Sequence, residues 1–280
     1  MVRALALCLL VAGCTPPPQA DPEFSDATRF LFRSIEAEEP AELAFALRAL
    51  RDGVTSELDL DSTDSADRAL VPERLEAADA ADITTPAGTD IEVGLAITVA
   101  ARSAYLPDDH TEIQLLADQT PVEPNSPNQY DRVFLDGADC WATRACDWLR
   151  TDNEILRENL ILELPYGLRK DLRWVDVALP DPSTVPEGQP VVNEGAPSWA
   201  LVARSWTEEV AVGVEGENTL FGQYSVDVWI PFDGGTLRTL SLWWHLEGPA
   251  LADETQELTA RNGIASIFRR GDEYLDENAR

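Results

Sequence analysis

The stretch IEVGLAITVAARSAY at residues 91–105 is the clearest strand pattern in this chain. Its apolar side chains alternate strictly, and one face carries Ile91, Val93, Leu95, Ile97, Val99 and Tyr105. The small or polar residues on the other face are Glu92, Gly94, Ala96, Thr98, Ala100 and Arg102. A period of two is that of a β-strand, so residues 91–105 predict the first long strand of a sheet.

Further strands are expected in the second half of the chain, which holds all eight tryptophans between Trp141 and Trp244. Short apolar or alternating runs predict strands at residues 130–135, 148–164, 168–179, 199–206, 224–230 and 240–246. A helix over residues 155–164 is the open alternative. Asp233-Gly234-Gly235 predicts a tight turn between the last two strands. The pattern therefore indicates an antiparallel sheet.

The last element is a predicted helix at residues 253–275. Its apolar stripe consists of Ala260, Ile264, Ile267, Phe268, Gly271 and Leu275. At 1.5 Å per residue this helix is roughly 33 Å long, which is enough to cross a whole sheet. The sequence thus predicts an α+β fold, with an antiparallel sheet curved around a long C-terminal helix.

Residues 24–90 predict an N-terminal helical extension followed by an acidic linker. Two helices are expected, the second starting at Pro40 and ending at Gly53. The linker contains a short predicted helix at residues 74–81. Its aspartates do not form an EF-hand, because counting from Asp59 places Asp64 where glycine is needed and Leu70 where glutamate is needed.

This order of elements resembles the START-like helix-grip fold of polyketide cyclases and lipid-transfer proteins, over residues 91–280. The resemblance implies an apolar cavity between the sheet and the last helix, with Gly263 and Gly271 leaving room for a ligand. Trp244, Ile264 and Phe268 are the candidate ligand-binding residues. The alternative is that these side chains pack a dry core, as apolar stripes mostly do.

The first fourteen residues carry one charge, Arg3, and then an apolar run of about ten residues, too short to span a bilayer. Val11-Ala12-Gly13-Cys14 resembles the lipobox of bacterial lipoproteins. The resemblance implies a signal peptide at residues 1–13, a lipid anchor on Cys14 and a proline-rich tether at residues 14–23. The alternatives are an ordinary cleaved signal peptide or a start codon set too late.

The resemblance places the protein in the cell envelope, held to a membrane by its lipid. Thr15, rather than aspartate, follows the cysteine, which favours the outer membrane, on its periplasmic or surface face. The net charge of −30 repels nucleic acid, so no nucleic-acid partner is expected. Lys170 is the only lysine.

Cys140 and Cys146 are the pair left after the leader and the anchor, and in an exported protein they predict a disulfide. Two free thiols or half of a metal site are the alternatives. With only His110 and His245 as further soft ligands, a zinc site has too few donors, so neither a metal nor a cofactor is expected.

No G-x-S-x-G elbow, P-loop or H-E-x-x-H motif is present, and no catalytic residue is assigned. The leading hypothesis is a lipid-anchored protein that binds an apolar small molecule, a lipid or a partner protein. The second is a structural or interaction protein of the envelope, with a solid core and no ligand. The third is an acid–base hydrolase or cyclase, with His110 or His245 as the base.

Overall fold

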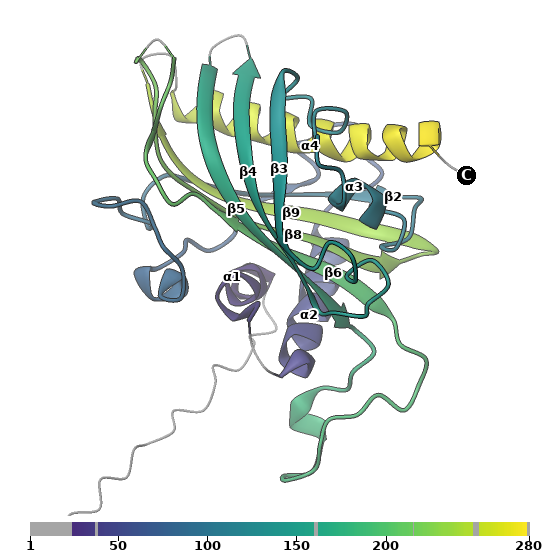
Figure 1. Cartoon of the computed structure of the whole chain (residues 1–280). Coiled ribbons are helices and arrows are strands. Elements are labelled where there is room, and N and C mark those ends of the chain that lie inside the picture. Colours follow the sequence, from purple (N-terminus) through teal and green to yellow (C-terminus); the bar gives the residue numbers. More distant parts are fainter. Residues whose placement is uncertain (1–23, 37–38, 160–161, 215, 249–251, 279–280) are drawn as a thin grey trace, which may run out of the picture.

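Antiparallel strands dominate the structure, a computed structural model that describes residues 24–36, 39–159, 162–214, 216–248 and 252–278 (Figure 1). In these residues the strands are β1 (Ala69–Leu70), β2 (Leu95–Ser103), β3 (Gln129–Asp136), β4 (Trp148–Asn159), β5 (Leu162–Asp176), β6 (Trp199–Trp206), β7 (Ala211–Val212), β8 (Thr219–Phe232) and β9 (Gly235–Glu247). The helices are α1 (Phe24–Ser34), α2 (Pro40–Glu57), η1 (Ala77–Ala80), α3 (Thr111–Gln114), η2 (Pro182–Thr184) and α4 (Asp253–Asn278).

All these strands belong to one sheet in the order β1-β2-β9-β8-β6-β5-β4-β3, with the short β7 paired to β8. Each of these strand pairs is antiparallel, and hairpin connections join neighbours such as β8 and β9. β2, the first long strand in the chain, pairs with β9, the last, so that Val99 lies opposite Leu240. The two ends of the strand-forming region therefore meet near one edge of the sheet.

α4 crosses one face of the curved sheet, which we call the inner face (Figure 1). Ala260, Ile264 and Phe268 of α4 pack there against Ile97 of β2 and Trp244 of β9. Burying each large apolar side chain stabilises the fold by about 1.5–3 kcal/mol. The expected architecture, an antiparallel sheet around a long C-terminal helix with an N-terminal helical extension, is confirmed.

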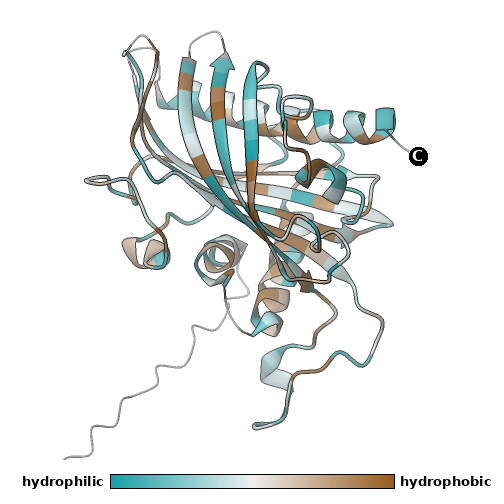
Figure 2. Cartoon of the chain, in the orientation of Figure 1, coloured by the Kyte–Doolittle hydropathy of each residue, from teal (hydrophilic) through white to brown (hydrophobic). Residues whose placement is uncertain are grey.

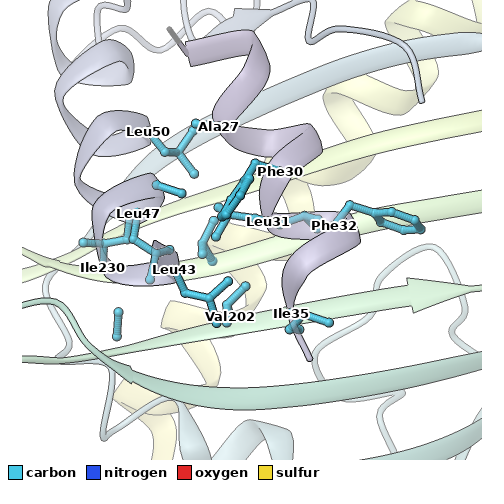
Figure 3. Packing of buried hydrophobic residues seen from close by; sticks show 14 of the residues in the cluster. Ala27, Phe30, Leu31, Phe32, Ile35, Leu43, Leu47, Leu50, Val202 and Ile230 are labelled. Carbon is cyan, nitrogen blue, oxygen red and sulfur yellow. The ribbon is translucent and has the colours of Figure 1, made fainter. Parts of the chain in front are cut away.

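α1 and α2 cover the opposite, outer face of the sheet (Figure 1). Figure 3 shows Leu31 of α1 and Leu47 of α2 among the buried residues next to Val202 of β6 and Ile230 of β8. Figure 2 shows apolar and polar residues interspersed along the strands. Both faces of the sheet are covered by helices, the inner face by α4 and the outer face by α1 and α2. The small face of β2 is buried as well, because Ala96 and Ala100 belong to this outer core.

Several predicted boundaries were wrong. β2 begins at Leu95 and not at residue 91, because Gly94 has a φ of 113°, which interrupts the extended backbone. α2 continues past Gly53 to Glu57, since the buried Val54 holds its last turn against the outer core.

Other differences are in the hairpin and the linker. A helix is not formed by residues 155–159 and 162–164; they lie in the paired strands β4 and β5, in which Arg157 pairs with Leu164. In the linker, only Ala77–Ala80 forms a helical turn, and the aspartate Asp79 there accepts a hydrogen bond from Arg29 of α1 at 2.6 Å.

Candidate functional site

The inner face of the sheet is not uniformly apolar. Two adjoining cavities, of about 80 Å³ and about 20 Å³, lie next to the apolar cluster under α4. Both are lined by Glu123, Lys170, Asp227 and Ile267. We call these two cavities together the inner chamber. Its charged lining residues come from five strands and one loop: Glu123, Arg132 on β3, Arg157 on β4, Lys170 on β5, Asp227 on β8 and Arg238 on β9.

Lys170 and Asp227 form the centre of the chamber, each less than 10% exposed. The lysine Nζ lies 3.7 Å from Oδ2 of the aspartate, and Oδ1 has no hydrogen-bond partner among the described residues. Burial lowers the pKa of Lys170 and raises that of Asp227, and each charge partly offsets the effect on the other. Strand order produces this pair, because β6 alone separates β5 from β8.

Arg157 and Arg238 flank this pair and lie over aromatic rings. The Arg157 guanidinium carbon is 5.3 Å from the ring centre of Trp244, and that of Arg238 is 4.5 Å from Phe268 and 5.5 Å from Trp229. The Nε atoms of both arginines are buried and lack a hydrogen-bond partner in the described structure. Ring contacts therefore contribute to stabilising both charges, and Arg238 also donates to the carbonyl oxygen of Phe268 at 3.4 Å.

Gly263 and Gly271 bring α4 close to these arginines. A Cβ atom at Gly271 would lie 2.9 Å from a terminal guanidinium nitrogen of Arg238. A Cβ atom at Gly263 would lie 3.2 Å from Asn125 and 3.6 Å from Arg157. The space beside both glycines is therefore filled by polar side chains of the protein itself. This differs from the expectation that the two glycines leave room for a ligand.

Arg132 differs from Arg157 and Arg238 in that its Nε has a hydrogen-bond partner. Its Nε donates to Oδ1 of Asn153 at 2.9 Å, and another nitrogen donates to the carbonyl oxygen of Gln114 at 2.5 Å. These bonds tie β3 to β4 and to α3. Arg132 is accordingly a structural residue that also adds positive charge to the chamber.

Glu123 lies where the chamber meets solvent, since it and Asn125 line the cavity and are only half-buried. Desolvation raises the pKa of the Glu123 carboxyl to about 7, although Lys170 and Arg157 act in the opposite direction. Near neutral pH this residue therefore exists in both charge states, and the net charge of the chamber changes with its protonation.

A larger opening lies at the other end of the inner face. It is a cleft of about 1090 Å³ between the β1–β2–β9 edge of the sheet and the first turns of α4. Its apolar side chains include Leu70, Val71, Leu95, Ile97 and Leu246. The polar groups at its rim include Arg74, which donates to the carbonyl oxygen of Glu92, and Arg261, which donates to Ser65. We refer to it as the cleft.

Trp244, Ile264 and Phe268, the candidate ligand-binding residues, belong to the apolar cluster between the cleft and the inner chamber. Within that cluster Ile97 also lines the cleft, whereas Leu242 and Ile264 line the chamber. The three candidates are buried against one another and against the sheet. The cluster therefore separates the two openings.

His110 is completely buried and belongs to a hydrogen-bonded chain. Its Nε2 lies 3.2 Å from Oγ of Ser103, and that hydroxyl donates to Asp272 at 2.8 Å, so Nε2 is the protonated nitrogen. Burial, with the nearby Arg238 charge, lowers the histidine pKa well below its usual value. In a nucleophilic triad the acid contacts the histidine; here it contacts the serine.

His245, the other candidate base, lines the cleft. Its ring stacks on Phe221 with centroids 4.7 Å apart, and its Nε2 lies 3.2 Å from Oε1 of Glu247. Of the two histidines, only His245 lies next to an opening large enough for a substrate.

Cys140 and Cys146 form a disulfide, as expected. The loop that they close carries Trp141, which is fully buried and packs against Trp174 of β5, with ring centroids 5.5 Å apart. The bond therefore fixes a loop that covers one end of the sheet. In the described ranges, no group of three or more His, Cys, Asp or Glu side chains is arranged to hold a metal ion.

The lipobox, Cys14 and the tether lie outside the described residues. Among the helices that the structure does describe, none combines the length and the apolar character needed to span a bilayer.

No protein-family model matches this chain, and no curated protein matches it. Among solved structures, the chain is similar to a protein from Thermus thermophilus at 13% identity and a TM-score of 0.41, over 65% of this chain and 98% of the other. It is also similar to a STAR-related lipid transfer protein from Xanthomonas axonopodis at 10% identity and a TM-score of 0.40, over 65% and 85% of the two chains.

A third similar structure is the di-domain ARO/CYC StfQ from the steffimycin biosynthetic pathway, at 6% identity and a TM-score of 0.32, over 64% of this chain and 46% of the other. Likeness at these TM-scores does not assign a function to this chain.

The inner chamber was not predicted from the sequence, because the strands were recognised by their apolar residues and the charged residues between them were not considered. One signal was available: Tyr166, Leu168, Lys170, Leu172 and Trp174 alternate along β5, so the only lysine of the chain sits in the middle of an apolar face. A charge in that position needs a buried partner, and the partner, Asp227, is 57 residues away.

Proposed function

We propose that this chain is a lipid-anchored protein of the bacterial envelope whose folded domain binds a small, partly apolar molecule in the cleft. On this proposal the folded domain is START-like, because its order of secondary-structure elements resembles that of START-like proteins. A lipid on Cys14 holds this domain to the membrane. The anchor is supported by the sequence Val11-Ala12-Gly13-Cys14 and the ligand site by the cleft. Outer-membrane placement remains part of the proposal through Thr15.

The observation that carries the ligand site is the combination of size and lining. Small-molecule sites typically enclose about 300–1,000 Å³ and combine apolar walls with a few polar groups. The cleft, of about 1090 Å³, is slightly above the upper limit of this range and has both apolar and polar lining residues. Val71 and Val93 at its edge are 76% and 47% exposed. Large apolar side chains left in water at an opening favour an apolar occupant.

The site can be tested with the neutral apolar dye N-phenyl-1-naphthylamine, whose fluorescence rises in apolar surroundings. Leu95→Glu places a charge on the cleft wall, and Leu135→Glu is the matched control because Leu135 is an exposed residue of β3, at the opposite edge of the sheet. We expect Leu95→Glu to weaken dye binding by at least about tenfold and Leu135→Glu to leave it unchanged.

Thermal melting of both variants establishes that they are folded. Equal dye affinity for Leu95→Glu and the unmodified protein, or no dye binding by the unmodified protein, would contradict the proposal. Mass spectrometry of a denaturing extract of purified protein then identifies any ligand that co-purifies.

A further inference from the structure

The inner chamber carries more positive than negative charge. Its four cations are opposed by Glu123 and Asp227. A third carboxylate, Asp272 of α4, acts on Arg238 from outside the chamber lining and accepts a hydrogen bond from Ser103. This arrangement is unusual in a chain of net charge −30, where only 21 residues are basic. Buried charge is costly unless it is paired, so an excess of buried cations needs a compensating negative group.

Three of the chamber cations have binding capacity that the protein does not use. Lys170 has one carboxylate oxygen at 3.7 Å, beyond hydrogen-bond distance. Arg157 and Arg238 each have a buried Nε without a partner among the described residues. Asp227 likewise keeps one oxygen without a partner. Each of these residues is more than nine-tenths buried. Buried polar atoms without a protein partner indicate a ligand that binds in the chamber.

We propose that the inner chamber binds a small oxyanion, a carboxylate or phosphate group, through Lys170 and Arg157, with Arg238 adding positive charge from the adjoining cavity. Such a group matches the chamber in size, because about 80 Å³ holds several water molecules and hence a few oxygen atoms, but no large ligand. Glu123 and Asn125 mark the side from which it enters.

A purely structural Lys170–Asp227 pair is the simpler explanation, and the geometry argues against it. A buried ion pair stabilises a fold only with excellent geometry and with its remaining lone pairs satisfied. Here the closest N–O distance is 3.7 Å and one oxygen has no partner among the described residues. Two further arginines beside the pair add positive charge that the pair cannot neutralise.

The proposal goes beyond the cleft, since the anion site would exist whether or not the cleft has a ligand. The anion has two sources that share this chemistry: a free small anion, or the charged end of an amphipathic molecule. Titration calorimetry with inorganic phosphate and acetate tests the first source. Dodecyl phosphate, compared with the neutral dodecanol, tests the second.

The variants are chosen to give opposite results. Lys170→Gln and Arg157→Gln should each weaken anion binding by about tenfold or more, since each removes a charged donor. Asp227→Asn removes the competing carboxylate and should strengthen binding by a similar factor. Arg269→Gln is the matched control, because that arginine is an exposed residue of α4 with a side chain 72% exposed.

Binding of phosphate or acetate that follows this pattern supports a free anion. Binding of dodecyl phosphate alone, with the same pattern and no binding of dodecanol, supports an amphipathic ligand. If Lys170→Gln and Arg157→Gln do not fold, Glu123→Gln decides the matter, because this carboxylate at the entrance is only half-buried and its removal should likewise strengthen anion binding at pH 8. Unchanged affinity in Asp227→Asn, equal binding of dodecanol and dodecyl phosphate, or no binding of any anion would overturn the proposal.

Discussion

Nζ of Lys170 on β5 lies 3.7 Å from Oδ2 of Asp227 on β8, and both side chains are buried beneath α4 on the inner face of the sheet. The pair places the only lysine of the chain in the interior. It lies between the apolar cluster that packs against Ile264 of α4 and a second apolar cluster that includes Leu172 and Trp229. The pair therefore places two opposite charges inside a layer that is otherwise largely apolar.

The first prediction concerns the coupling between these two residues. Asp227→Asn leaves a buried ammonium among further cations, so it should lower the free energy of unfolding by about 3–5 kcal/mol. Lys170→Met leaves a carboxylate that still interacts with Arg238, so it should cost less. The double variant Lys170→Met/Asp227→Leu should lose less than the sum of the two single variants. Urea unfolding of the four proteins measures this; losses that simply add would show that the pair is not coupled.

The second prediction is a pH dependence of anion binding in the chamber. Since burial raises the pKa of Glu123 to about 7, this carboxyl takes up a proton as the pH falls from 8 to 6, and its negative charge disappears. The affinity for sulfate, which does not titrate in this range, should rise accordingly by several-fold. The charged residues that face Glu123 are Arg132, Arg157, Lys170, Asp227 and Arg238.

The control for this prediction is Glu123→Gln, which removes the titrating group and leaves the cations in place. It should bind sulfate at pH 8 about as tightly as the unmodified protein does at pH 6, with little change between. A variant that keeps the full pH dependence would assign the effect to another residue, with Asp227 the next to test because burial raises its pKa too.

The third prediction separates two effects at glycines with positive φ. Gly88→Ala meets no atom within 4 Å and should cost about 1 kcal/mol, for backbone strain alone. Gly94→Ala would put a Cβ 2.1 Å from the carbonyl oxygen of Trp244 and should cost at least about 2 kcal/mol more. Similar losses in chemical denaturation would mean that β2 and β9 do not approach closely there.

The fourth prediction concerns the disulfide. Replacing Cys140 and Cys146 by serine should lower the free energy of unfolding by about 2 kcal/mol, the chain-entropy value for so short a loop. The loss should appear as a red shift of tryptophan emission if the loop with Trp141 opens. A loss well below this value would indicate that the packing of Trp141 on Trp174 holds the loop without the bond.

The fifth prediction tests the proposed lipid anchor. In bacterial cells the full chain should sediment with membranes and incorporate labelled palmitate, and Cys14→Ser should abolish both. Cys140→Ser is the control because that residue lies in the folded domain; it should not change labelling. Labelling that persists in Cys14→Ser would contradict the anchor.

The local pattern of the sequence is sufficient for much of the fold. The predicted strand at residues 199–206 coincides with β6, and the predicted C-terminal helix starts at Asp253, as α4 does. Alternation along a strand and a stripe along a helix are properties of neighbouring residues, so they can be recognised without knowing what packs against them. The Cys140–Cys146 disulfide could be predicted from cysteine count, since these two residues are the pair left after the leader and the anchor.

The inner chamber depends on long-range pairing instead. Lys170, Asp227 and Arg238 meet because β5, β6, β8 and β9 are neighbours in the sheet, and an apolar pattern carries no information on which strands become neighbours. The sequence by itself determined the elements and the acidic character of the chain. Only the tertiary structure decided that four of its few cations face one another inside, because strand order and the approach of α4 create that proximity.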